Sequence, residues 1–181
     1  MFFMLGQAML DASIAAWDAK RAYNSVRPIS AIRTACAGQS IQCWGGVGNG
    51  VATMPGENWM PYQRPTNPTP NFPEFASGHS TFSAAAATVL AALRGNQISL
   101  VFSFPARSIP FDPTVPGAAA TISWPSFSAA AEAAGLSRRY GGIHFAQGDL
   151  KGRALGVAVG ITVIKRVGSL VNWKAPANLK N

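Results

Sequence analysis

Five residues of the chain have side chains or backbone positions suited to binding an oxyanion. Lys20 and Arg27 are seven residues apart, about two helical turns, so both can point the same way near a helix end. Ser77 and Gly78 stand at the start of a predicted helix, where free backbone N–H groups and the helix dipole favour an anion. Arg138 adds a planar guanidinium that stays charged. Together these groups predict a cationic hole of phosphate shape.

The two histidines of the chain, His79 and His144, both lie beside these groups in the sequence. A neutral imidazole close to phosphorus or vanadium can attack or bind it, and a second imidazole can move protons near its ordinary pKa. A lone histidine is more often a core residue with satisfied hydrogen bonds, and a lone Lys20 or Arg27 is more often a solvated helix residue. The ordered combination of all these residues favours a site.

Three motifs that contain these residues resemble a signature shared by vanadium-dependent haloperoxidases, type 2 phosphatidic acid phosphatases and bacterial acid phosphatases. Their order and spacings agree over about residues 11–150, although Ser-Gly-His alone would be a weak match. The motifs are Lys20-x6-Arg27-Pro28, Ser77-Gly78-His79 and Ser137-Arg138-x5-His144. The resemblance implies a helical bundle that holds vanadate or phosphate at one end.

The resemblance also implies a role for each matching residue. His144 matches the position that binds vanadium in the peroxidases and attacks phosphorus in the phosphatases, and His79 matches the acid–base histidine. The oxyanion-binding positions are those of Lys20, Arg27, Ser77, the Gly78 backbone N–H and Arg138. Trp17 and Phe72 fall where chloroperoxidase-like members carry aromatic residues near the halide, with simple core packing as an equal alternative.

Two longer segments, residues 23–33 and 72–79, look like soluble bacterial haloperoxidase-type proteins. The chain departs from that pattern at Ala76, where the family usually has proline, and it begins almost at the first motif helix. We interpret residues 1–181 as a single haloperoxidase/acid-phosphatase-like catalytic domain. A C-terminal half of a longer architecture, a truncated gene and a minimal member are the open alternatives. A missing half would expose the first helix to a homodimer or partner chain.

The function that the resemblance favours is a vanadate-dependent haloperoxidase, which oxidises halide with hydrogen peroxide to hypohalous acid that halogenates a small organic acceptor. Vanadate is the implied cofactor, and phosphate can occupy the same site. One alternative is a soluble acid phosphatase that hydrolyses phosphomonoesters through a phosphohistidine at His144, with His79 protonating the leaving alcohol. The other alternative is a truncated, non-catalytic member that binds oxyanions.

Helices must bring these residues together, and the fold class predicted from the sequence is all-α with long proline- and glycine-rich loops. Apolar spacing and capping residues predict the helices 3–24, 80–93, 127–136 and 143–170, and a turn or short helix over 29–34. Loops are predicted over 36–76 and 105–125, and a strand or extended segment over 98–104. Glycines recur at positions 148, 152, 156 and 160, so we expect close packing against the alanine-rich helix.

Composition narrows the set of partners. The 181 residues suffice for one domain, and 15 Lys+Arg against seven Asp+Glu give a net charge of +8, which indicates anionic partners. The basic residues are dispersed without a Lys/Arg-rich run, so we expect no nucleic acid. No apolar run is long enough to span a membrane and no signal peptide is evident, while the compartment stays undetermined. A disulfide between Cys36 and Cys43 is left open.

Overall fold

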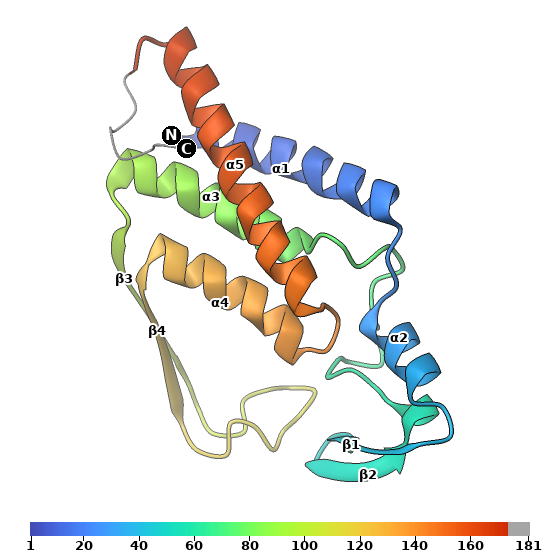
Figure 1. Ribbon diagram of the computed structural model, residues 1–181. Coiled ribbons are helices and arrows are strands. Elements are labelled where there is room, and N and C mark those ends of the chain that lie inside the picture. Colours follow the sequence, from blue (N-terminus) through green and yellow to red (C-terminus); the bar gives the residue numbers. More distant parts are fainter. Residues whose placement is uncertain (174–181) are drawn as a thin grey trace.

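The computed structural model describes residues 1–173, and most of them are helical (Figure 1). In chain order the elements are α1 (Phe2–Tyr23), α2 (Pro28–Ala35), β1 (Ser40–Trp44), β2 (Val51–Pro55), the 3-10 helix η1 (Gly56–Asn58), α3 (Gly78–Arg94), β3 (Gln97–Phe104), β4 (Ala120–Ser126), α4 (Phe127–Tyr140) and α5 (Ala146–Leu170). The predicted helices are therefore present, with shifted ends.

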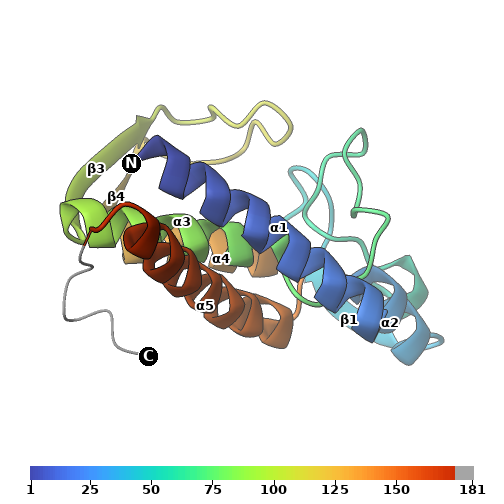
Figure 2. The same cartoon turned by 90° about the horizontal axis from the view of Figure 1, so that it is seen from above.

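Helix α3 is the centre of the bundle, because it packs against α1, α4 and α5 (Figures 1 and 2). Its alanine-rich sequence leaves little side-chain volume, which lets the neighbouring helices come close. An apolar cluster holds the N-terminal half of α1 against the C-terminal halves of α3 and α5 through Met4, Ala8, Val89, Val163 and Ile164. The opposite end of the bundle, where α1 ends and α3 and α5 begin, is left for polar groups.

Glycines along α5 allow the close approach of α3, as the sequence predicts for three of the four positions. A Cβ atom added at Gly152, Gly156 or Gly160 would meet backbone or side-chain atoms in residues 77–88 of the α3 region. Gly148 differs, because a Cβ there would meet the carboxylate of Glu74 instead. The glycines of α5 therefore leave space for two neighbours, helix α3 and the buried side chain of Glu74.

A turn, rather than helical periodicity, brings Lys20 and Arg27 to the same end of the bundle. Helix α1 ends at Tyr23, since Asn24 is left-handed with a φ of 42°. Arg27 is the extended N-cap of α2, and Pro28 occupies the first turn of that helix. The expectation that these two cations share helical turns is wrong, because they stand on different elements.

The ends of α4 and α5 also differ from the prediction in a way that matters for the site. Ser126 caps α4 by accepting a hydrogen bond from Ala129 N. The helix continues to Tyr140 rather than stopping at 136, so Arg138 belongs to its last turn. Helix α5 begins at Ala146 rather than at 143, which places His144 in the short connection between the two helices.

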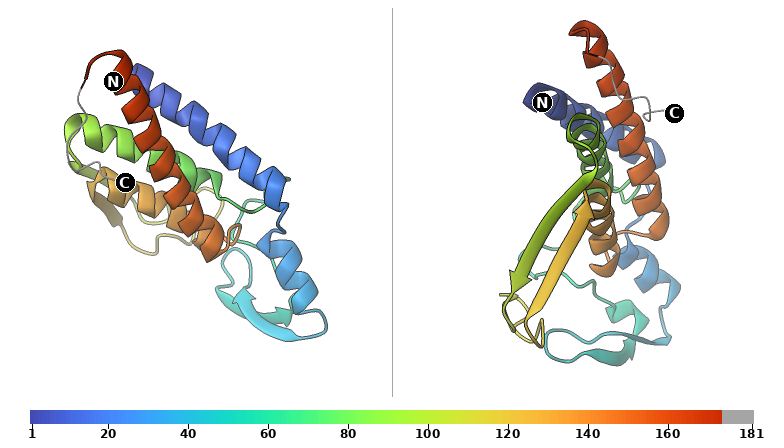
Figure 3. Two further views of the ribbon diagram at one scale, coloured as in Figure 1. Left: turned by 45° about the horizontal axis from the view of Figure 1, so that its top comes forward. Right: turned by 90° about the vertical axis from the view of Figure 1, so that its left-hand side faces the viewer.

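Two antiparallel hairpins correct the all-α prediction. In the first, β1 pairs with β2 inside the range that we expected to be a loop. In the second, β3 pairs with β4, and β4 also lies in a predicted loop. Most residues of both hairpins are at least partly exposed, so the alternation that marks a half-buried strand is weak in the sequence. Figures 1 and 3 show the β3–β4 hairpin extending from the bundle as an arm.

Two smaller expectations concern the cysteines and the membrane. Cys36 and Cys43 are both free thiols, so the disulfide left open by the sequence is not formed in this structure. Among the helices of residues 1–173, none combines the length and the hydropathy needed to cross a lipid bilayer.

Candidate active site

A cavity of about 220 Å³ opens at the polar end of the bundle, where α1 and α4 end and α3 begins. All the site residues predicted from the sequence line this cavity, except Lys20 and Ser77, which lie behind its wall. A larger groove of about 560 Å³ between α3, α4 and α5 is lined mainly by alanines and other small or apolar side chains. The two charged residues of that groove, Glu132 and Arg153, pair with each other.

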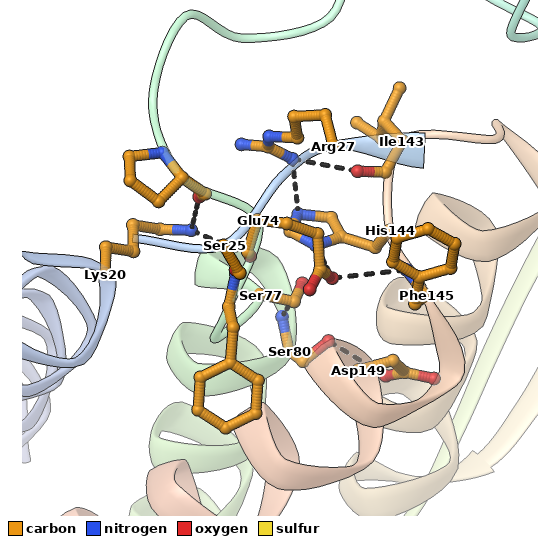
Figure 4. A network of polar contacts seen from close by, with 12 residues as sticks. Lys20, Ser25, Arg27, Glu74, Ser77, Ser80, Ile143, His144, Phe145 and Asp149 are labelled. Atoms are coloured by element: carbon orange, nitrogen blue, oxygen red, sulfur yellow. Dashed lines mark hydrogen bonds and ion pairs between the residues drawn. The ribbon is translucent and has the colours of Figure 1, made fainter. Parts of the chain in front are cut away.

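Arg27 is a buried cation with an unused hydrogen-bond donor. Its Nε donates to Phe72 O at 2.9 Å. Its Nη1 donates to Ile143 O, also at 2.9 Å (Figure 4). Nη1 also contacts Nε2 of His144 at 3.1 Å. The remaining nitrogen, Nη2, is buried and has no hydrogen-bond partner among residues 1–173. These contacts fix the orientation of the guanidinium. They leave the N–H groups of Nη2 available to a ligand.

Arg138 is a second cation that lines the cavity. Its Nε is buried and has no hydrogen-bond partner in the part of the chain that the structure describes. Burial lowers the pKa of its guanidinium from the ordinary value. Leaving a buried charged donor unsatisfied costs about 1–3 kcal/mol or more. With unpaired donors on both Arg27 and Arg138, the cavity is built to receive an acceptor of negative charge.

Lys20 supports the cavity from behind its wall. Its side chain is 2% exposed, and Nζ donates to Pro73 O at 2.8 Å and to Glu74 O at 3.1 Å. Nζ also lies 5.0 Å from the centroid of the Phe72 ring. Burial and the positive charge of Arg27 lower the pKa of Lys20 to about 8, against the opposing effect of Glu74. The lysine is thus charged at neutral pH and close to its titration.

His144 is held at both ring nitrogens. Nδ1 lies 2.7 Å from Oε1 of Glu74, and Nε2 faces Nη1 of Arg27. Because a guanidinium only donates hydrogen bonds, Nε2 must be the acceptor and Nδ1 must carry the proton. Burial lowers the pKa of His144, and Arg27 acts in the same direction, while the hydrogen bond that Nδ1–H donates to Glu74 opposes them. His144 is therefore a neutral imidazole whose Nε2 lone pair points towards the cations.

Glu74 is a site residue that the sequence reasoning missed. Its side chain is 4% exposed, and the same oxygen that meets His144 also accepts the backbone N–H of Phe145. The available signal was weak: Glu74 is one of seven acids in a basic chain and stands five residues before His79. The position of Glu74 in the sequence does not indicate that its partner is His144, 70 residues away.

The N-terminus of α3 contributes the remaining donors. Ser77 caps the helix by accepting from Ser80 N, as predicted. Gly78 is the first residue of α3, where backbone N–H groups lack an acceptor within the helix. His79 follows it and is exposed to the cavity mouth. Partial burial and the positive charge of Arg138 lower the pKa of His79, and protonation of His144 would lower it further, so this imidazole is neutral near pH 7.

Aromatic rings form the apolar wall of the cavity. Trp17 lies 5.3 Å from Phe72 between ring centroids, and it stacks on Phe82 at 6.2 Å. All three rings line the cavity, so Trp17 and Phe72 are not solely core residues. Phe82 lies one turn after Gly78 in α3. The sequence reasoning did not select it. Arg27 lies against one of these rings, with its Cζ 5.0 Å from the centroid of Phe72. A cavity lined by both cations and rings suits a small anion beside an apolar surface.

Comparison with known proteins assigns the chain to a family. A family model described as the VCPO second helical-bundle domain matches residues 1–173, and the chain belongs to this family. The solved structures confirm the resemblance to the vanadium haloperoxidase superfamily. A search of curated proteins finds no match of comparable significance.

Two of the similar solved structures are bacterial enzymes. One is a holo-type bacterial vanadium-dependent chloroperoxidase, with a TM-score of 0.82, 27% sequence identity, and 91% of this chain matched to 34% of that chain. The other is a bacterial vanadium-dependent iodoperoxidase, with a TM-score of 0.62, 32% identity, and 90% of this chain matched to 32% of that chain. The present chain thus spans about a third of the length of each.

Proposed function

We propose that this domain binds vanadate and acts as the catalytic domain of a haloperoxidase. The observation that carries the proposal is a pair of buried donors without a partner among residues 1–173, Arg27 Nη2 and Arg138 Nε. Both arginines line the same cavity as His144, whose Nε2 is an acceptor. An oxyanion with a Lewis-acidic centre matches both features, because its oxygens accept from the cations and its centre accepts the imidazole lone pair. A bare metal cation matches neither arginine.

Different residues would bind the oxygens and the vanadium of vanadate. Arg27, Arg138 and the Gly78 N–H line the cavity and would orient the negative oxygens, while Lys20 would add positive charge from outside the lining. His144 would bind the vanadium through Nε2, whose lone pair would give up the hydrogen bond from Arg27 Nη1. Bound vanadate supplies a Lewis acid that activates hydrogen peroxide towards attack by halide. The chain therefore contributes binding, orientation and proton transfer rather than redox chemistry of its own side chains.

His79 is suited to the proton transfer. Its lowered pKa keeps an imidazole nitrogen unprotonated near pH 7, so this nitrogen can take a proton from hydrogen peroxide in the cavity. The rings of Trp17, Phe72 and Phe82 add an apolar surface to the same cavity. A halide and hydrogen peroxide are small enough for a cavity of about 220 Å³. Organic acceptors would react with released hypohalous acid.

The test is bromide oxidation by phosphate-free protein with hydrogen peroxide, with and without orthovanadate. We expect turnover that requires both reagents and disappears in His144→Ala. In His79→Ala we expect orthovanadate to remain bound while most turnover is lost, because that imidazole moves protons rather than holding vanadium. Orthovanadate binding without bromide oxidation would contradict the peroxidase proposal.

Hydrolysis of p-nitrophenyl phosphate separates the alternative activity from the proposed one. An acid phosphatase would use the same cations and the Nε2 of His144 to attack phosphorus. Phosphate ester hydrolysis that orthovanadate inhibits, without bromide oxidation, would replace the peroxidase proposal by the phosphatase.

A further inference from the structure

We propose that Glu74 is a positioning residue that fixes the orientation and tautomer of His144, so that Nε2 is presented to an oxyanion in the cavity. The inference rests on the proposed oxyanion function and adds a residue outside the three motifs. Figure 4 shows the arrangement: Glu74 lies on the far side of the imidazole from Arg27, and the ring is held between them.

The hydrogen bonds around the ring define a chain of donors and acceptors. Arg27 Nη1 donates to Nε2 of His144, and Nδ1–H of His144 donates to Oε1 of Glu74 at 2.7 Å. The same Oε1 accepts Phe145 N at 3.1 Å. Two donors from adjacent residues therefore converge on one carboxylate oxygen, which orients both the ring and the peptide that carries it.

The backbone around Glu74 is itself fixed by α1 and the α1–α2 turn. Glu74 N donates to Ser25 O at 3.0 Å, and its carbonyl accepts from Lys20 Nζ. The next residue, Phe75, donates its N–H to Ser25 Oγ at 2.8 Å. The carboxylate is thus held by a segment that also carries two of the oxyanion-binding cations.

Room for this carboxylate depends on Gly148. A Cβ atom at that position would collide with both carboxylate oxygens of Glu74. The first glycine of the row on α5 is therefore explained by the acid and not by helix packing. A buried carboxylate next to an anion site would weaken anion binding by repulsion, so its presence calls for a compensating role at the imidazole.

The test compares two substitutions that separate the acceptor from the charge. Glu74→Gln removes the charge but keeps a side-chain oxygen, which Phe145 N–H and Nδ1–H can still share. Glu74→Met is similar in length and removes the acceptor. Glu57→Met is the matched control, since Glu57 is an exposed carboxylate in η1.

The first readout is ¹⁵N and ¹H NMR of His144 in protein without oxyanion. We expect a neutral Nδ1–H tautomer with a hydrogen-bonded Nδ1 proton in the unsubstituted protein, in Glu74→Gln and in Glu57→Met. In Glu74→Met we expect loss of that hydrogen-bonded proton signal. An unchanged His144 signature in Glu74→Met would overturn the proposal.

The second readout is the affinity for orthovanadate measured by titration calorimetry. We expect Glu74→Met to bind orthovanadate about 10- to 100-fold more weakly, with Glu74→Gln closer to the unsubstituted protein. Equal affinity in all variants, or equal losses in the Gln and Met variants, would overturn the positioning role. Failure of the peroxidase proposal alone would appear as absent bromide oxidation with both readouts as expected.

Discussion

Lys20 has a side chain that is 2% exposed, and its ammonium group donates to two backbone carbonyls. No carboxylate oxygen is among those acceptors, so its positive charge is compensated only partly, by Glu74 at longer range. The cost of burial appears as a pKa lowered to about 8. At the scale of single residues, Lys20 is therefore a fixed cation whose charge the protein compensates only in part.

The lowered pKa of Lys20 predicts how oxyanion affinity depends on pH. The ammonium is charged below about pH 8 and loses its proton as the pH rises through that value. Affinity for an oxyanion should therefore be high at pH 7 and fall above pH 8, by up to about tenfold for each pH unit. The two histidines, with pKa values below the ordinary one, are already neutral in this range.

Tungstate is the suitable probe, because it stays a dianion from pH 7 to 9 while phosphate and vanadate titrate. Calorimetric titration at each pH gives the affinity. Lys20→Met should bind tungstate more weakly at pH 7 and should not show the loss above pH 8. The same pH dependence in Lys20→Met would assign the titration to another group.

Packing between two elements decides whether the site is assembled at all. Helix α5 follows the His144 segment and lies against α3, which carries Ser77, Gly78 and His79 at its start. The glycines of α5 set the distance between these helices. A Cβ atom at Gly156 would meet Thr81 O and the Cβ of Ala84. Widening this contact would also move His144 relative to the α3 N-terminus.

We predict that Gly156→Ala lowers the free energy of unfolding by about 1–3 kcal/mol, since the added methyl has no space. Gly6→Ala is the matched control, because Gly6 is also a helical glycine and has nothing within 4 Å of an added Cβ. Its expected effect is a gain of up to about 1 kcal/mol from helix propensity. Urea unfolding of both variants measures the difference, and equal effects would contradict close α3–α5 packing.

Ligand binding should raise the stability of the whole domain, because the cavity is lined by residues from α1 to the α4–α5 connection. An anion that binds the folded state alone stabilises it by about 2.7 kcal/mol at a concentration of 100 times Kd. For a chain of this size, we therefore expect orthovanadate to raise Tm by about 5–10 °C. Thermal unfolding followed by circular dichroism measures the shift.

Adjacent arginines supply the control for this shift. Arg138→Ala removes a donor that lines the cavity, so the orthovanadate-dependent rise in Tm should be much smaller. Arg139→Ala removes a charge that lies 3.7 Å from Asp149, outside the cavity, and should keep most of the rise. Identical shifts in the two variants would mean that the ion binds elsewhere.

Local sequence was enough to predict the helices and most of the selected residues that line the cavity. Ser77 before an alanine-rich run marks the start of α3, because capping depends on residues three positions apart. Lys20, Arg27, Arg138 and both histidines could be chosen by type and spacing, and the structure brings the arginines and histidines to one cavity. Local patterns indicated a strand or extended segment over 98–104, which is β3, but not the other three strands of the two exposed hairpins, which pair across turns and carry little burial signal.

The sequence by itself determined which residue types are available: an excess of cations, two histidines and helices bounded by caps and glycines. Only the tertiary structure decided which donors stay unpaired and which nitrogen of His144 faces them. That choice depends on Glu74, 70 residues away from His144, and on the space left by Gly148. Hydrogen bonds between distant segments follow from packing, which neither composition nor periodicity records.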